Sequence, residues 1–346
     1  MEERPMPRLG YWMTALISAV LVAGCGGAGE EETLNVYSAR KEALIKPLLD
    51  RFGQESGMEV KLLTADAGAL LSRLENEGRN TPADVLITVD AGNLHRAREA
   101  GVLAATDSAV LESAIPAHLR DEQGHWFGLS QRARVIFTHA DRVEEGAITS
   151  YEDLADPEWE GRVCIRSSDN VYNQSLVASM IAEHGEEETQ AWAEGLVDNM
   201  ARDPQGGDRD QIRAVAAEEC DVAVANTYYY GAMQNGGTDD QEAAEAVRLV
   251  WPNQDDRGAH VNVSGGGVVA ASQNRDRARA LLEFLTTDES QQWYAKANNE
   301  FPVKAGVPAA DTLAKWGDFQ ADDLPLTRLG ELNARAVRLM DRAGWR

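Results

Sequence analysis

Three consecutive tyrosines at positions 228–230 are the most distinctive chemical feature of this 346-residue chain. They follow a short apolar stretch, residues 221–225, and the pair Asn226-Thr227. A phenol has a pKa of about 10, so a phenolate at neutral pH requires strong positive charge beside it. Ferric iron is hard and highly charged, and it favours hard oxygen donors. The run therefore raises the hypothesis of a ferric-iron site, against the alternative of half-buried packing residues.

Two cysteine–tyrosine spacings match. Tyr172 follows Cys164 by eight residues, and Tyr228 follows Cys220 by eight residues. Each cysteine lies at or near the start of a predicted strand, and each tyrosine lies just past the end of that strand. If the strands are parallel neighbours, the tyrosines converge at the carboxyl edge of the sheet, where open α/β sheets bind ligands. A Cys164–Cys220 disulfide would then join the strands near their starts, and two buried free thiols are the alternative.

A helix that begins at Asn226-Thr227 would let adjacent tyrosines reach one point. Asn and Thr are favoured capping residues, and successive helical side chains are separated by about 100°. Tyr228 and Tyr229 can then both face a ligand in front of the helix, whose positive dipole end favours phenolate. Tyr230 would point elsewhere, into packing.

The rest of the chain alternates predicted strands and helices, which indicates an α/β fold with mostly parallel sheets covered on both faces. The predicted strands are residues 34–37, 58–63, 84–89, 134–139, 163–166, 221–225 and 260–271. The predicted helices are residues 43–52, 70–77, 94–100, 176–182, 189–197, 212–217, 276–285, 289–297 and 329–340.

The composition argues for an exported protein that does not bind nucleic acid. The formal net charge is −24, whereas phosphate binding requires positive patches. Arg4 and Arg8 precede an apolar stretch at residues 11–24, which is typical of a signal segment and ends in a lipobox-like sequence at Cys25. Cleavage and lipidation at Cys25 are expected, with residues 26–33 as a flexible tether; a plain secretory signal is the alternative.

Several segments together resemble the ferric-iron-binding proteins of bacterial ABC transporters. The matching segments are Asn35-Val36-Tyr37-Ser38-Ala39-Arg40-Lys41-Glu42, Thr81-Pro82-Ala83-Asp84-Val85, Asp90-Ala91-Gly92, the connector at residues 153–161, residues 167–175 around Tyr172, and Ala225-Asn226-Thr227-Tyr228-Tyr229. The resemblance covers nearly all of the mature chain. It implies a two-lobed periplasmic-binding-protein fold (type II-like), with a mostly parallel sheet in each lobe and a cleft between the lobes.

The resemblance also implies a division of the chain. The expected parts are a signal peptide at 1–25, a tether at 26–33, lobe 1 from 34–131 plus about 258–305, and lobe 2 from 132–257 plus about 306–346.

By motif position, Tyr172, Tyr228 and Tyr229 match the metal ligands of that family. Some members add a histidine or a histidine–tyrosine pair where this chain has Lys41 and Glu42, and some add a glutamate where it has Val89. Lobe 1 is therefore expected to give no side-chain ligand, or at most Glu42.

Three phenolates leave an octahedral ferric ion short of donors, so carbonate, another exogenous anion or water should complete the shell. A guanidinium fork suits a planar anion. Arg40 and Arg132 are the predicted anion-binding residues, with Arg134 third.

The predicted function is capture of ferric iron outside the cytoplasm, in the periplasm or cell envelope, and delivery to an inner-membrane ABC permease. The protein is expected to be a lipid-anchored monomer and not an enzyme, since the motifs of hydrolases, zinc proteases and thiol oxidoreductases are missing from the sequence. The alternative is the same fold binding a polyamine, a phosphonate or a similar small solute, with the tyrosines as cage walls. An exported enzyme and a purely structural lipoprotein are more distant alternatives.

Overall fold

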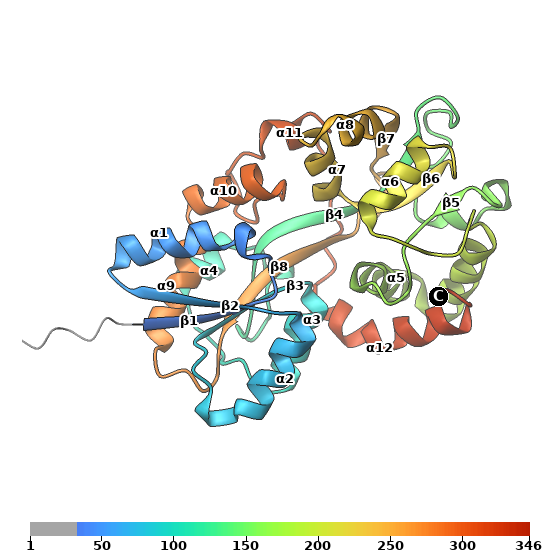
Figure 1. Ribbon diagram of the computed structural model, residues 1–346. Coiled ribbons are helices and arrows are strands. Elements are labelled where there is room, and N and C mark those ends of the chain that lie inside the picture. The colour runs from blue at the N-terminus through green and yellow to red at the C-terminus, as the bar shows by residue number, and fades with distance from the viewer. Residues whose placement is uncertain (1–32) are drawn as a thin grey trace, which may run out of the picture.

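The computed structural model describes residues 33–346, and the predicted signal segment, the tether and Cys25 lie outside that range. Its strands form one curled mixed sheet in the order β2-β1-β3-β8-β4-β6-β5, with β7 paired to β4 (Figure 1). The strands are β1 (Thr33–Ser38), β2 (Glu59–Thr64), β3 (Val85–Val89), β4 (Phe127–His139), β5 (Val163–Cys164), β6 (Val222–Asn226), β7 (Val247–Val250) and β8 (Val261–Val268).

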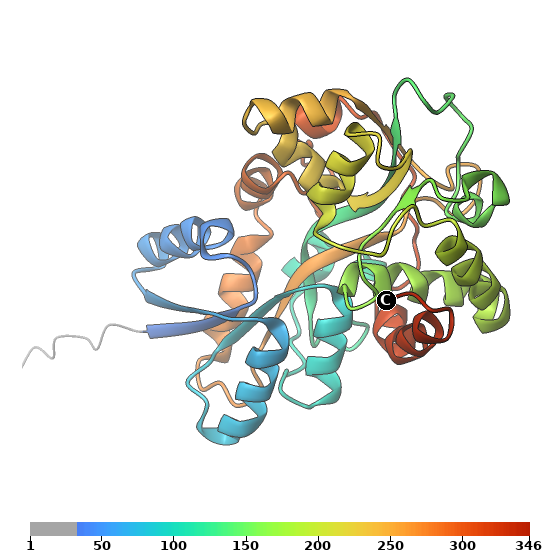
Figure 2. The same ribbon diagram turned by 45° about the vertical axis from the view of Figure 1, so that its right-hand side comes forward.

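Helices gather in two groups at the two ends of this sheet, and both views show the long strands β4 and β8 running between them (Figures 1 and 2). We call the group around β1–β3 lobe 1 and the group around β5–β7 lobe 2. The helices are α1 (Lys46–Ser56), α2 (Ala67–Glu77), α3 (Ala91–Glu99), α4 (Ala109–Ala114), α5 (Val171–Asp198), α6 (Asp208–Ala216), α7 (Thr227–Gln234), α8 (Thr238–Glu245), α9 (Arg275–Leu285), α10 (Asp288–Asn298), α11 (Asp311–Ala314) and α12 (Thr327–Arg342). The predicted residue boundaries of the lobes stay a prediction.

The prediction of mostly parallel sheets is correct only at the two ends. Strand β1 is parallel to both β2 and β3, and β5 is parallel to β6. The central strands β4 and β8 are antiparallel to each other, and β8 is antiparallel to β3. Strand β4 is also antiparallel to β6 and β7. The expectation fails in the middle because these two strands run across the molecule in opposite directions and serve both lobes.

Strand β4 changes its pairing partner in mid-course, which places its side chains between the lobes. Ala133 pairs with Val261 of β8, whereas the next residue, Arg134, pairs with Asn226 of β6. A third segment crosses here, because Gln131 and Phe301 exchange two backbone hydrogen bonds of 2.9 and 2.7 Å. Residues 131–134 of β4 therefore form the junction of the molecule.

The glycine run of β8 is a packing feature. A Cβ atom at Gly265 would lie 2.5 Å from the carbonyl oxygen of Phe127, and one at Gly267 would lie 2.3 Å from that of His125. Such distances are far below van der Waals contact, so only glycine allows this close approach.

The two predicted helices at 176–182 and 189–197 lie within α5, which has non-helical backbone at Gly185 (φ 82°, ψ 174°). The predicted final helix corresponds to α12, which packs on α5 of lobe 2 and on α3 of lobe 1. Helix α12 therefore bridges the two lobes. Within residues 33–346, no helix has the length and apolarity required to cross a membrane.

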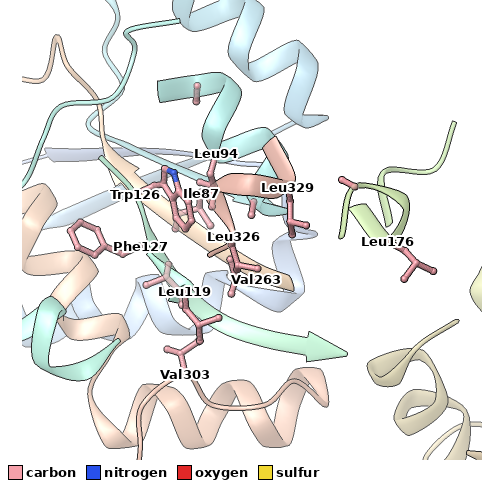
Figure 3. Close-up of a cluster of buried hydrophobic side chains, with 14 of the residues drawn as sticks. Ile87, Leu94, Leu119, Trp126, Phe127, Leu176, Val263, Val303, Leu326 and Leu329 are labelled. Atoms are coloured by element: carbon pink, nitrogen blue, oxygen red, sulfur yellow. The ribbon is translucent and has the colours of Figure 1, made fainter. Parts of the chain in front are cut away.

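The main buried core forms around the central strands. Ile87 of β3, Phe127 of β4 and Val263 of β8 lie together with Trp126 (Figure 3). The C-terminal segment joins the same core, through buried leucines at positions 326 and 329. The core thus connects segments that are far apart in sequence, as burial of apolar area requires in a fold with crossing strands.

Candidate metal centre

The structure places the three predicted tyrosine ligands at the starts of two neighbouring helices. Tyr172 is the second residue of α5, and Asn170 caps that helix by accepting a hydrogen bond from the backbone N–H of Tyr172 at 3.2 Å. Tyr228 and Tyr229 are the second and third residues of α7, which begins directly after β6. Because β5 and β6 are parallel neighbours, both helix starts lie at the same edge of the sheet.

The phenol groups meet at one side of a cavity between the lobes. The hydroxyl of Tyr228 donates to the hydroxyl of Tyr172 at 3.1 Å. The rings of Tyr228 and Tyr229 have their centroids 4.2 Å apart. All three line a cavity of about 260 Å³, and we call them the tyrosine wall. Neighbouring oxygen ligands of an octahedral cation with bonds of about 2.0 Å lie roughly 3 Å apart, so the spacing of Tyr172 and Tyr228 suits one shared ion.

Burial keeps the phenols of Tyr228 and Tyr229 protonated when no cation is present. Burial, followed by the nearby Tyr172 and Tyr229, raises the pKa of Tyr228 well above its ordinary value. Burial also raises the pKa of Tyr229 to about 12, with Tyr172 as the next cause. Phenolates in this cavity therefore require a cation with enough charge to displace the protons.

Arg132 is the cation that stands closest to the tyrosine wall without a full complement of partners. Its side chain is buried, and its guanidinium lies 5.3 Å from the ring centroid of Tyr172. Within residues 33–346, neither terminal nitrogen of Arg132 has a hydrogen-bond partner, and the nearest carboxylate oxygen, of Asp90, lies 3.6 Å away. Two unpaired donors on one planar group form a bidentate site for an anion.

Asp90 is itself fully engaged. It caps α3 by accepting from the backbone N–H of Gly92 at 2.8 Å, and it accepts from Asn262 at 2.8 Å. Burial raises the pKa of Asp90 to about 6, although the charge of Arg132 acts in the opposite direction.

The opposite side of the cavity comes from lobe 1 and the end of α10. We call it the lobe 1 wall, and it includes Arg40, Lys41, Val89, Ser264 and Glu300. It offers no phenol, imidazole or thiolate at those five positions. Glu42, the predicted additional ligand, is exposed in a short 3₁₀ turn and is not among the residues lining the cavity.

Arg40 lies in this wall but is already paired. Its guanidinium makes a buried ion pair of 2.6 Å with Glu300 and donates to Ser130 at 3.2 Å. Burial alone would lower the pKa of Arg40, but the combined interactions with Glu300, Tyr294 and Tyr228 raise it.

Arg134, the third predicted anion-binding arginine, does not line this cavity. Its guanidinium donates to Asp208 at 2.9 Å, to Asn226 at 3.0 Å and to Asn173 at 2.5 Å. The side chain of Asn226 therefore binds Arg134 and does not cap α7, contrary to expectation. Arg134 ties the starts of α5 and α7 together beneath the tyrosine wall.

The cysteines and the last tyrosine stabilise lobe 2 behind the site. Cys164 and Cys220 form a disulfide with a Cα–Cα distance of 5.9 Å. Tyr230 points into packing, as predicted: it is 7% exposed, its hydroxyl donates to the carbonyl of Ala244 at 3.2 Å, and its ring packs on Phe137.

Sequence reasoning missed Glu300 and Arg209, which also line the cavity. Glu300 lies far along the chain from every motif, just after α10, and no local pattern marks it. Arg209 follows Asp208 at the start of α6 and is exposed at the cavity. A search for charged residues at predicted helix starts of lobe 2 would have found Arg209.

Known proteins resemble the chain over most of its length. The family model described as bacterial extracellular solute-binding protein matches residues 80–320. Iron uptake protein A1 of Synechocystis sp. is 44% identical over 100% of this chain and 99% of its own. The Fe(3+)-binding periplasmic protein of Serratia marcescens is 29% identical over 94% of this chain and 95% of its own. A solved structure of the Trichodesmium protein IdiA (FutA), in complex with iron and citrate, has a TM-score of 0.88 at 45% identity and covers 91% of this chain and 100% of that one.

Proposed function

The chain belongs to the family of bacterial extracellular solute-binding proteins, and we propose that its solute is ferric iron, bound through Tyr172, Tyr228 and Tyr229. The observation that carries the proposal is the tyrosine wall itself: three phenols from two helix starts line one cavity, beside a buried guanidinium whose terminal nitrogens have no hydrogen-bond partner in the described chain. The relatives named for iron uptake and for Fe(3+) binding support ferric iron over a polyamine or phosphonate.

Charge balance explains why such a site can be buried. Three phenolates cancel the charge of Fe³⁺, and the cation suits hard oxygen donors. The remaining coordination positions take an exogenous anion, for which carbonate is our first choice. The two terminal nitrogens of Arg132, which have no hydrogen-bond partner in the described chain, bind this anion. Arg40, also predicted for this role, lies on the facing wall with its guanidinium directed to Glu300 and Ser130.

Capture and release follow from the two walls. The tyrosine wall assembles within lobe 2, and movement of the lobes about the junction at residues 131–134 closes lobe 1 over the bound ion. The closed form is then recognised by an ABC permease of the inner membrane. We expect a monomer in the periplasm or cell envelope, held to the membrane by a lipid on Cys25.

A titration of the metal-free protein with ferric iron in bicarbonate buffer tests the proposal. Ferric phenolate absorbs visible light, so a visible band should grow until one equivalent is bound. A polyamine or phosphonate in place of iron should give no band and no rise in melting temperature. A protein that stays colourless with ferric iron, and is stabilised by an organic solute instead, would overturn the proposal.

A further inference from the structure

Glu300 is a buried carboxylate in the wall of a cavity that is proposed to take an anion. It is 4% exposed. It accepts hydrogen bonds from Arg40 at 2.6 Å, Ser130 at 3.0 Å and Ser264 at 3.3 Å, and from Asn298 at 3.4 Å. Four donors, from the segment after β1 and from β4, β8 and α10, converge on this one side chain. Such complete satisfaction holds the carboxylate in place.

The effect of this arrangement is to neutralise one of the two buried arginines at the cavity. Arg40 directs one terminal nitrogen to Glu300 and the other to Ser130. Arg132 differs, because both of its terminal nitrogens lack a hydrogen-bond partner in the described chain and Asp90 stays at 3.6 Å. An incoming anion can therefore accept hydrogen bonds from the terminal nitrogens of Arg132, whereas those of Arg40 already donate to Glu300 and Ser130.

The buried charges in the cavity leave little positive charge for an anion. Three phenolates cancel Fe³⁺, and Glu300 cancels Arg40, so among the buried residues lining the cavity Arg132 is the one left to attract an anion. Its charge is offset in part by Asp90, whose carboxylate lies 3.6 Å from a terminal nitrogen of Arg132. Lys41 and Arg209 also line the cavity but are exposed, where water screens their charge. Excess negative charge in a buried site is costly, so an anion of low charge fits best.

We propose that Glu300 limits the charge of the anion that accompanies the ferric ion, and that it does so as a positioning residue acting through Arg40. This inference rests on the proposed function and adds the selectivity of the anion position. Of the carbonate species, singly charged bicarbonate is accepted, and more highly charged oxyanions are disfavoured. Substitution of Glu300 frees the guanidinium of Arg40, which then offers a second fork beside Arg132.

The test compares anions in the wild type and in Glu300→Gln. The apparent ferric affinity is measured by visible titration of metal-free protein with either bicarbonate or inorganic phosphate, which carries more negative charge near neutral pH. The wild type should prefer bicarbonate. In Glu300→Gln, the affinity ratio of phosphate to bicarbonate should rise about tenfold or more, with the visible band unchanged. Glu289→Gln, which removes a well-exposed carboxylate paired with Arg51 on the same stretch of chain, should keep the wild-type ratio.

A double variant, Arg40→Met/Glu300→Gln, separates this role from a structural one. It removes both buried charges together, which is tolerated better than removal of one partner, so it remains informative if the single variant does not fold. It should return the anion ratio to the wild-type value. A ratio like that of Glu300→Gln alone, or loss of anion-dependent binding, would overturn the inference, because Arg40 would then not be the residue through which Glu300 acts.

Two further outcomes distinguish the proposals. If the wild type binds no ferric iron with any anion, the proposed function and this inference both fail. If the wild type binds iron and Glu300→Gln has an unchanged anion ratio, or loses the visible band, this inference alone fails.

Discussion

The two walls of the cavity differ in kind. The tyrosine wall carries three phenol donors on two helix starts, whereas the lobe 1 wall carries an ion pair, a lysine and the apolar Val89. One wall is equipped to coordinate a metal, and the other is equipped to set charge and to cover the site. Under the proposed function, this difference leads us to expect that metal affinity resides in lobe 2 and that control of the anion resides at the junction and in lobe 1.

The tyrosine wall is supported from beneath by a network of buried polar side chains. Arg134 connects Asp208, Asn226 and Asn173 beneath it, and Arg166 pairs with Asp208 at 2.5 Å while lying 6.0 Å from the ring centroid of Tyr172. Donors that are held in position before binding lose less entropy when the metal arrives. We therefore expect substitutions in the two walls to change the ferric affinity by different amounts.

The largest fall in ferric affinity is expected when phenol groups of the tyrosine wall are removed. Tyr228→Phe/Tyr229→Phe removes two of three phenolates and should lower ferric affinity by more than about 100-fold, since even supporting residues of metal sites contribute about 10- to 100-fold. Visible titration and competition with a chelator measure this. Tyr230→Phe is the matched control, because Tyr230 bonds the backbone of Ala244 and does not line the cavity. Equal affinity in the double variant and the wild type would contradict the assignment.

The next effect concerns the junction. Arg132→Gln removes the two unpaired donors and should lower ferric affinity about 10- to 100-fold in bicarbonate, with a much smaller loss in buffer free of bicarbonate. Arg209→Gln at the exposed side of the same cavity should change the affinity less than about fivefold, as expected of a screened surface charge. If the two variants behave alike, Arg132 has no special role in anion binding.

A third prediction concerns pH. The raised pKa values of Tyr228 and Tyr229 mean that the metal-free protein keeps these protons at neutral pH, so ferric binding must release them. The affinity should therefore fall as the pH falls, by up to about tenfold per pH unit for each proton displaced. Titrations at several pH values, with proton release followed in unbuffered solution, measure this. Without metal, pH acts on folding stability in the opposite direction. The contribution of protonated Tyr229 to stability is complete below about pH 10 and is lost as the pH rises towards its raised pKa of about 12.

The smallest expected effect lies at the back of the molecule, where α12 bridges the lobes. A Cβ atom at Gly330 would lie 2.3 Å from the side chain of His95 on α3, so Gly330→Ala should lower the free energy of unfolding by about 1–3 kcal/mol. Gly68→Ala, in α2 with nothing within 4 Å, should be neutral or stabilising by up to about 1 kcal/mol. Urea denaturation compares the two. Ferric affinity should stay within a few fold if the tyrosine wall holds independently of α12.

Local patterns in the sequence were enough to predict the parts of the site that lie on single elements. The order of a strand, a capping pair and a helix along the sequence correctly predicted that Tyr228 and Tyr229 lie at the start of α7. The equal spacings from the cysteines indicated that Tyr172 lies beside them. The parallel pairing of β5 and β6 is confirmed. Each of these predictions depends only on residues that are close together in the sequence, where the periodicity of apolar residues indicates helix or strand directly.

The features that depend on distant segments could not be read in this way. The antiparallel course of β4 and β8 arises because they serve both lobes, and hydrophobic runs alone do not report strand direction. Glu300 meets Arg40 across 260 positions of sequence. The side chain of Asn226 could satisfy either α7 or Arg134, and only the fold shows that Arg134 is chosen.

The position of β8 in the sheet has a consequence for how the chain is made and exported. Strand β8 begins at Val261 yet pairs with β3 on one side and β4 on the other. Until more than 260 residues have been synthesised or translocated, both of those strands keep an open edge, and open edges invite pairing with other chains. The sheet of lobe 1 therefore cannot be completed before β8 arrives.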